Sequence, residues 1–282
     1  IHIIKAKEIA SSTIKFIKEN RYSLNKKKIA NSFSNAASTY ESVSRLQSQT
    51  GKKLLTMMPN QITPNTIIDL GCGTGCLVKS IQNKNSYSKI IGLDLAEGML
   101  KMAKSQYDYT GVWLCADAEN IPLANNSVDI IFSNLTFQWC SQTASLAKEI
   151  ARILKPGGKL LFTTLGENTL YELKTSWMKV DSYVHVNKFL DTDIWKRAFV
   201  NEGIQFEEFQ VCDYILKYGD LSDLMYELKK LGAHNLNSGQ KKTMTNKKNI
   251  RNLINAYDQY RDPKGNLPAT WQVIFGVGVL GA

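Results

Sequence analysis

The apolar residues near the N-terminus recur with the spacing of amphipathic helices. Over residues 1–24, lysines and glutamates lie largely outside one apolar helical face, which holds Ile3, Ile4, Ala10, Ile14 and Ile17. A second helical pattern runs from about Lys27 to Met57. We therefore predict a separate N-terminal element over residues 1–24, followed by a long helical segment.

A different pattern begins at residue 66, where short apolar runs alternate with amphipathic stretches. Fully apolar strands interleaved with helices form right-handed βαβ units, so this pattern predicts a parallel sheet with helices on both faces. Pro156-Gly157-Gly158 is interpreted as a turn that ends a helix and leads back into the sheet. Strands are predicted at Thr66–Leu70, Lys89–Asp94, Gly111–Ala116, Val128–Ser133 and Lys159–Leu165, and helices at Glu97–Tyr107 and Ser145–Leu154.

The alternation loosens after Leu165. Neither an internal repeat nor a low-complexity linker interrupts the sequence, which therefore predicts one α/β domain with elaborations at both ends. The expected helices are Leu170–Val180, Thr192–Glu202, Leu221–Leu231 and Lys248–Tyr260, and the expected strands are Gln205–Leu216 and Trp271–Val277.

The composition narrows the class of protein. The chain has 282 residues and five cysteines, an odd number without regular spacing, which argues against a secreted disulfide framework and favours a reducing compartment. No apolar run approaches the roughly 18–20 residues that span a bilayer, and the N-terminal stretch lacks the apolar core of a signal peptide. We therefore expect a cytoplasmic protein with no membrane partner.

The net charge of +10 is concentrated in the two flanks of the chain. Residues 1–56 carry a net charge of +8 and residues 221–282 a net charge of +5, while residues 57–220 carry −3. Such a distribution can steer an acidic partner toward one face. The lysine excess of an AT-biased genome would produce the same pattern, so both interpretations stay open.

The clearest chemical signal is the glycine-rich run that follows the first predicted strand. Gly71, Gly73 and Gly75 allow a sharp turn and a close approach of a ligand to the backbone, and the next helix points its N–H groups at the same place. Asp69 would repel the pyrophosphate of a dinucleotide but suits a cation such as S-adenosylmethionine. A plain structural turn is the alternative.

Acidic residues also follow the second and third predicted strands. Asp94 ends the second strand, where a carboxylate can accept hydrogen bonds from both ribose hydroxyls. Asp117 and Ala118 follow the third strand, where a side-chain acceptor and a backbone N–H can bind an adenine edge. Each residue alone is typical of a cap or turn, but together they mark the crevice where open α/β sheets bind ligands.

These motifs resemble those of class I methyltransferases that use S-adenosylmethionine. The resemblance covers roughly residues 65–165, and it implies a Rossmann-like, seven-stranded, mostly parallel sheet whose last strand is antiparallel. Its motifs are Asp69-x-Gly71-x-Gly73-x-Gly75, Asp94, Asp117-Ala118-Glu119 and Leu154-Lys155-Pro156-Gly157-Gly158. The cofactor-binding residues that it implies are Asp69, Gly71, Cys72, Gly73, Gly75, Asp94, Leu95, Met99, Asp117, Ala118, Glu119 and Asn134.

A narrower resemblance covers most of the chain except residues 1–24, which are either native or an added segment. It is to the BioC family, the malonyl-acyl carrier protein O-methyltransferases of biotin synthesis. It implies a methyltransferase domain over residues 25–282, with a helical cap over 25–58 and a substrate-side elaboration over 166–265. The residues that carry it are Phe33 to Ala37, Tyr40-Glu41, Leu46-Gln47, Ser133-Asn134-Leu135, Gln138-Trp139-Cys140, Phe162 to Leu165, Glu172-Leu173, His185, Asn187 and Phe189.

The chemistry implied by this resemblance needs no general base. A malonyl carboxylate is ionised at neutral pH and can attack a methyl group in line, so catalysis reduces to positioning the carboxylate and excluding water. The resemblance places Tyr40 over the cofactor, where its hydroxyl can bind the attacking oxygen; packing within a helix is the alternative. His185 and Phe189 are candidates for lining an acyl channel, and an acidic acyl carrier protein bearing the malonyl thioester is the expected partner.

The same part of the sequence also bears on other possible functions. Cys72 and Cys76 have no second cysteine or histidine cluster, so no metal site is predicted. A nucleic-acid amino-methyltransferase would need a polar-Pro-Pro-aromatic step where Ser133 to Thr136 stands, so a nucleic-acid partner is not expected. A quinone-ring C-methyltransferase and a non-catalytic assembly factor with the same fold remain the alternatives.

Overall fold

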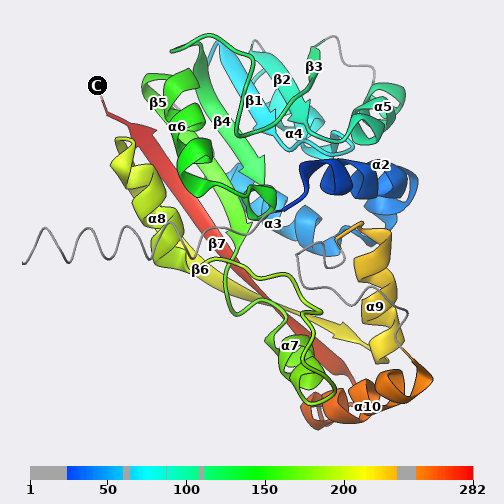
Figure 1. Cartoon of the computed structure of the whole chain (residues 1–282). Helices are drawn as coiled ribbons and strands as arrows, with labels where there is room; N and C mark the ends of the chain where they lie inside the picture. The colour runs from blue at the N-terminus through cyan, green and yellow to red at the C-terminus, as the bar shows by residue number, and fades with distance from the viewer. Residues whose placement is uncertain (1–23, 60–63, 87, 108–110, 234–245, 282) are drawn as a thin grey trace, which may run out of the picture.

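A twisted seven-stranded sheet forms the middle of the molecule (Figure 1). The computed structural model describes residues 24–59, 64–86, 88–107, 111–233 and 246–281, so the element predicted over residues 1–24 lies almost entirely outside the described residues. The sheet order is β3-β2-β1-β4-β5-β7-β6, and β7 is antiparallel to both of its neighbours, which confirms the expected fold. The strands are β1 (Thr66–Leu70), β2 (Lys89–Asp94), β3 (Val112–Cys115), β4 (Val128–Asn134), β5 (Leu154–Leu165), β6 (Ile204–Tyr218) and β7 (Leu267–Leu280).

Helices cover both faces of the sheet, as the apolar strands predict. Apolar residues of one face pack against α3 (Arg45–Thr56), α4 (Cys76–Lys84) and α5 (Glu97–Gln106). Those of the other face pack against α6 (Thr143–Ile153) and α8 (Thr192–Asn201). Ile67 and Ile68 illustrate the alternation, because neighbouring side chains of β1 belong to opposite cores and both are fully buried.

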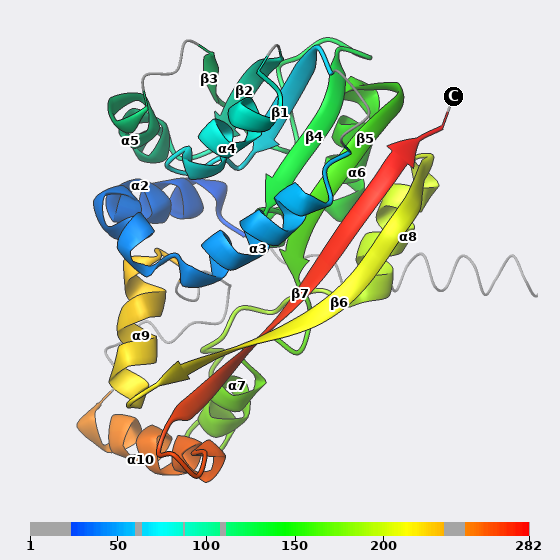
Figure 2. The ribbon, with the colours of Figure 1, turned by 180° about the vertical axis from the view of Figure 1, so that it is seen from behind.

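The predicted helical segment from Lys27 to Met57 is two helices rather than one. α2 (Lys26–Val43) ends at Ser44, and α3 starts at the next residue in a different direction (Figure 2). The physical reason is that the two helices bury their apolar residues against different partners. α2 packs on α5 and α9 (Leu221–Lys230), whereas α3 packs on β4 and β5.

The prediction that Pro156-Gly157-Gly158 forms a turn outside the sheet is wrong. β5 begins at Leu154, directly after α6, and already pairs there with Val128, so the three residues lie inside the strand. The pairing register shifts between Val128 and Ile130, and Gly157 has φ +76°, a conformation that glycine adopts without strain. The sequence therefore forms a bulge in the strand.

The last two strands extend far beyond the rest of the sheet. β5 pairs with β7 only from Val273 to Val279, so the first part of β7 and the end of β6 form a two-stranded ribbon. The helices α7 (Tyr171–Met178), α9 and α10 (Lys247–Tyr257) lie along this ribbon, below the carboxyl ends of the parallel strands (Figures 1 and 2). They lie within the elaboration predicted over 166–265. α7 and α9 contribute walls of the site described next, and α10 packs on α7.

Candidate active site

The glycine-rich loop after β1 shapes the floor of a cavity at the carboxyl ends of the parallel strands. Gly71 and Gly73 both have positive φ, and both line the cavity. A Cβ on Gly71 would come within 2.0 Å of the Thr136 side chain, so no larger residue fits there. A Cβ on Gly73 would meet only Tyr40, at 3.9 Å. The loop thus leaves room for a ligand between Gly73 and the helix above it.

Asp94 connects this loop to α5. Its two carboxylate oxygens accept backbone hydrogen bonds, one from Gly73 N at 2.9 Å and the other from Ala96 N at 2.7 Å. Burial raises the pKa of Asp94, and these backbone donors oppose that effect. Each oxygen keeps lone-pair capacity toward the cavity, which suits a ligand with two neighbouring hydroxyls.

Asp69 lies behind the loop, outside the cavity lining. It is 1% exposed, and among the described residues its Oδ2 atom has no hydrogen-bond partner. Burial, and secondly the neighbouring Asp94, raise the pKa of Asp69 to about 8. An unpaired buried carboxyl group is costly unless a donor or cation reaches it, so this residue favours a cationic ligand.

The loop after β3 contributes Asp117 and Ala118 to the cavity wall, whereas Glu119 lies outside the lining. Asp117 Oδ1 lies 2.6 Å from the ammonium group of Lys26, which also pairs with Glu119. Glu119 accepts a further bond from Gln142 N at 2.6 Å. Lys26 was not among the predicted site residues, and the 91 residues between it and Asp117 explain why no local pattern reveals the pair.

Two aromatic residues of α2 cover the cavity. Tyr40 and Phe33 pack edge to face with ring centroids 6.4 Å apart, and Phe33 makes a similar contact with Trp139 at 5.2 Å. Burial raises the pKa of the Tyr40 phenol, which therefore stays protonated and can act as a hydrogen-bond donor. This geometry is what the predicted role of Tyr40 requires.

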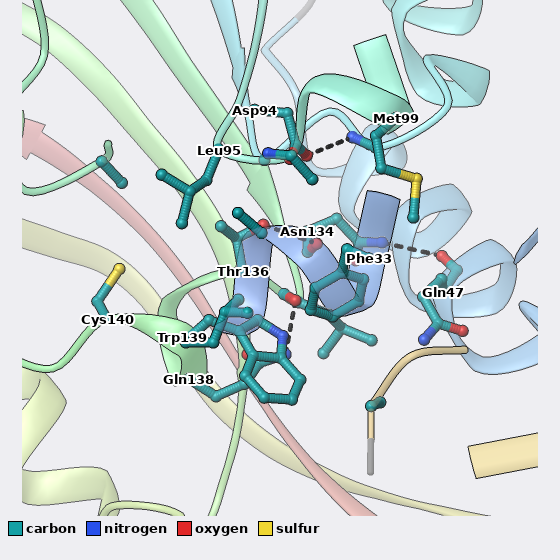
Figure 3. Close-up of a pocket in the computed structure, with 18 of the residues that line it drawn as sticks. Phe33, Gln47, Asp94, Leu95, Met99, Asn134, Thr136, Gln138, Trp139 and Cys140 are labelled. Atoms are coloured by element: carbon teal, nitrogen blue, oxygen red, sulfur yellow. Dashed lines mark hydrogen bonds between the residues drawn. The ribbon is translucent and has the colours of Figure 1, made fainter. Parts of the chain in front are cut away.

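The helical cap is fastened to loops that follow three of the parallel strands. Thr74 of the glycine loop donates to Glu41 at 2.8 Å, and Gly98 N at the start of α5 donates to Ser34 at 3.1 Å. The amide of Asn134, at the end of β4, donates to the backbone oxygen of Gln47 at 2.9 Å (Figure 3). The cap is therefore a structural wall of the cavity.

Of the remaining residues predicted to bind the cofactor, some line the cavity and others lie outside it. Leu95, Met99 and Asn134 line the cavity, whereas Cys72 and Gly75 lie outside the lining. Cys72 is buried in the core, where burial raises the pKa of its thiol well above the usual range. The lining also includes residues for which the sequence predicted no role, among them Lys26, Phe33, Gln47, Thr136 and Gln138.

A second, mostly apolar cavity of about 450 Å³ adjoins the first. Its walls come from α7, from α9 and from the segment between α7 and α8, and both His185 and Phe189, the candidates for an acyl channel, line it. His185 stacks on Trp177 with ring centroids 3.5 Å apart, and its Nε2 atom lies 2.7 Å from Asp181. Four residues line both cavities: Trp139, Leu165, Ala233 and Trp271.

The first cavity fits S-adenosylmethionine on its own chemistry. Within the described part of the chain, two buried acceptors lack donors: Gln47 Oε1 in the cavity lining, and Asp69 Oδ2 behind the glycine-rich loop. The ammonium group of a ligand supplies a donor for Gln47 and a positive charge near Asp69. Asp94 suits the ribose hydroxyls, and Leu95 and Met99 add apolar surface for a base. The described residues contain no cluster of three or more side chains suited to a metal ion, and no helix among them is long and apolar enough to cross a bilayer.

Comparisons with known proteins agree with this geometry. A family model described as a methyltransferase domain matches residues 68–162. The chain is 36% identical to the "Malonyl-[acyl-carrier protein] O-methyltransferase" of Hahella chejuensis, over 90% of each chain. It is 39% identical to the "Biotin biosynthesis bifunctional protein BioHC" of Cellvibrio japonicus, over 98% of this chain and 54% of that protein. The chain therefore spans about half the length of the bifunctional relatives that it matches.

Solved structures show the same fold at low sequence identity. A putative methyltransferase from Bacillus halodurans superposes with a TM-score of 0.61 at 14% identity, over 83% of this chain and all of that one. The YcgJ protein of Bacillus subtilis gives a TM-score of 0.60 at 16% identity, over 83% of this chain and 98% of that one. At these identities the likeness concerns the fold alone.

Proposed function

This chain belongs to the malonyl-[acyl-carrier protein] O-methyltransferase family, and from that premise we propose that it methylates the free carboxylate of a malonyl group on an acyl carrier protein. The methyl donor is S-adenosylmethionine, and the product is a malonyl methyl ester for biotin synthesis. The observation that carries the proposal is the pair of joined cavities, one built from the methyltransferase motifs and the other mostly apolar.

The proposed reaction requires the protein mainly to position its substrates. S-adenosylmethionine supplies a methyl group activated by its sulfonium charge. When it is bound, Asp94 would hold the ribose, Gln47 would accept from the ammonium group, and Asp117 would face the adenine. Asp69, buried behind the glycine-rich loop, would contribute its charge. The protonated phenol of Tyr40 donates a hydrogen bond to the malonyl carboxylate above Gly73. The carboxylate is already ionised, so no residue has to remove a proton.

The second cavity accommodates the thioester arm in this proposal. Its mostly apolar walls suit the methylene and sulfur atoms next to the malonyl group, and it adjoins the cofactor cavity at Trp139 and Trp271. His185, held between Trp177 and Asp181, and Phe189 form part of its wall. A long arm can thus reach the cofactor while its carrier stays outside.

An acidic carrier suits the basic rim of this second cavity. Lys229 lines the cavity, and Lys247, Lys248 and Arg251 belong to α10, which packs on α7 beside it. All four side chains are exposed. In the basic N-terminal flank, by contrast, Lys53 faces the sheet, with its ammonium 4.3 Å from the centre of the Phe275 ring. Lys241 and Lys242 lie outside the described residues. We therefore restrict the proposed carrier-binding rim to Lys229, Lys247, Lys248 and Arg251.

The proposal extends to the place of the reaction. All five cysteines lie in the described part of the chain and none forms a disulfide, as expected in the reducing cytoplasm. Nothing in the comparisons supports the two alternatives, a quinone-ring C-methyltransferase and a non-catalytic assembly factor.

A direct test uses purified protein, isotopically labelled S-adenosylmethionine and malonyl-acyl carrier protein. We expect label in a base-labile ester on the malonyl group, and none on acetyl-acyl carrier protein, which lacks the free carboxylate. An Asp94→Ala variant serves as the control for the cofactor site. Transfer to a quinol ring in place of the malonyl group, or no transfer to any substrate with bound S-adenosylmethionine, would contradict the proposal.

A further inference from the structure

Resting on the proposed function, we propose that Trp271 selects malonyl thioesters by donating a hydrogen bond from its indole N–H to the thioester carbonyl. Trp271 is one of the four residues that line both cavities. Of the other three, Leu165 and Ala233 have no polar side-chain atom. Among the described residues that line both cavities, polar side-chain atoms therefore occur only on Trp139 and Trp271.

The indole nitrogen of Trp271 is a donor without an acceptor. The side chain is 5% exposed, and its Nε1 atom has no hydrogen-bond partner among the described residues. A buried N–H group that has lost water and found no acceptor destabilises the fold. At the junction of two cavities, a ligand carbonyl can supply the missing acceptor.

Burial without a hydrogen-bond partner does not by itself indicate a substrate contact, because a second indole in the structure has the same property. Trp195 Nε1 is also buried without a partner in the described part of the chain. However, Trp195 belongs to the core on the other face of the sheet and lines neither cavity. Trp195 is therefore a matched control for Trp271.

The structure of the substrate places its carbonyl at this junction. In a malonyl thioester, one methylene group separates the reactive carboxylate from the thioester carbonyl. When Tyr40 holds the carboxylate in the first cavity and the arm runs through the second, the carbonyl must lie where the two cavities meet. A donor at that place recognises the thioester but takes no part in the methyl transfer itself.

The backbone on both sides of Trp271 is fixed by the segment that follows β5. Thr270 donates to the buried carboxylate of Glu172 from both its N, at 3.1 Å, and its Oγ1, at 2.5 Å. On the other side, the backbone oxygen of Gln272 accepts from Gly166 N at 2.8 Å and from Thr169 Oγ1 at 3.1 Å. Glu172 is 0% exposed, and anchoring Thr270 gives this buried carboxylate a role as a positioning residue.

The test compares two substrates in three proteins. The substrates are malonyl-coenzyme A and its carboxyethyl thioether analogue, in which a methylene group replaces the thioester carbonyl. The proteins are the wild type, Trp271→Phe and Trp195→Phe. Trp271→Phe keeps an aromatic ring but removes the donor, so kcat/KM for malonyl-coenzyme A should fall about three- to tenfold, the effect of one neutral hydrogen bond. Its kcat/KM for the thioether and its Kd for S-adenosylmethionine should stay at the wild-type values.

The control and the native protein complete the test. Trp195→Phe should leave the ratio of the two kcat/KM values unchanged. An equal loss on both substrates in Trp271→Phe, or an unchanged ratio, would overturn the proposal. If Trp271→Phe does not fold, calorimetry on the wild type saturated with S-adenosylhomocysteine replaces it. The wild type should bind the thioester more tightly than the thioether, and equal affinities would refute the carbonyl contact. If the wild type methylates neither substrate nor malonyl-acyl carrier protein, the proposed function fails instead.

Discussion

Binding of S-adenosylmethionine should release a proton from Asp69. Without ligand, burial and the neighbouring Asp94 raise the pKa of Asp69 to about 8, so about nine-tenths of this carboxyl is protonated at pH 7. The ligand would bring a cationic ammonium group to the cavity in front of Asp69, whose Oδ2 atom has no partner among the described residues, and a nearby positive charge favours the ionised form. The pKa of Asp69 should then fall below neutrality when the cofactor is bound.

The size of this effect follows from the raised pKa. At pH 7, binding should displace about nine-tenths of a proton from Asp69, and at pH 9 about one-tenth. The contribution of Asp69 to the Kd should therefore make binding about tenfold weaker at pH 7 than at pH 9. The amino group of the ligand also titrates in this range, so an Asp69→Asn variant is needed as the reference at each pH.

Isothermal titration calorimetry in two buffers with different ionisation enthalpies measures the released protons. We expect the wild type to release more protons at pH 7 than Asp69→Asn does, and the difference to vanish at pH 9. Equal proton release by the two proteins at pH 7 would refute the assignment of Asp69 to the ligand's cationic end. A folded Asp69→Asn protein with unchanged affinity at both pH values would refute it as well.

The same raised pKa of Asp69 predicts how the stability of the ligand-free protein depends on pH. A carboxyl whose pKa is higher in the folded state stabilises the fold most below its unfolded pKa of 3.8, and this contribution is lost as the pH rises toward about 8. Thermal unfolding of the wild type should therefore lose stability relative to Asp69→Asn between pH 4 and pH 8. Parallel pH profiles for the two proteins would show that Asp69 is not buried in its acid form.

Three further predictions concern the cofactor, the substrate and the carrier. Asp94→Ala should weaken S-adenosylmethionine binding about 10- to 100-fold, because a charged acceptor of about 1.5–3 kcal/mol is lost; unchanged calorimetric affinity in a folded variant would disprove it. Tyr40→Phe should lower kcat at nearly constant cofactor Kd, whereas intact turnover with a lower melting temperature would mean that Tyr40 only packs. Reversing exposed Lys247 and Lys248 to Glu should raise KM for malonyl-acyl carrier protein at low salt but not for malonyl-coenzyme A. Lys104→Glu on α5 is the control, and equal effects on both substrates would refute the carrier-binding rim.

Local patterns predicted the sheet well because its residues obey short-range rules. Asp94 and Asp117 each follow an apolar strand, and parallel strands bring their carboxyl ends to one edge, so spacing alone placed both residues at the cavity. The break at Ser44 and the bulge at Gly157 were missed for the opposite reason. Both depend on what the neighbouring segment packs against, and no local pattern contains that information.

The least predictable part of the site is the contact between the cap and the loop after β3, and it bears on how the cofactor enters. Lys26 pairs with Asp117 and Glu119, although Asp117 is the residue expected to face the adenine. Glu41 and Ser34 hold the same helix to the other two cofactor loops. A ligand beneath α2 can reach Asp117 in two ways. It either competes with Lys26 for the Asp117 carboxylate, or Lys26 stays paired with Glu119 alone. Because Glu119 lies outside the cavity lining, the second arrangement keeps α2 in place and leaves Asp117 free for the ligand. Glu119, the third residue of the motif Asp117-Ala118-Glu119, then has a physical role.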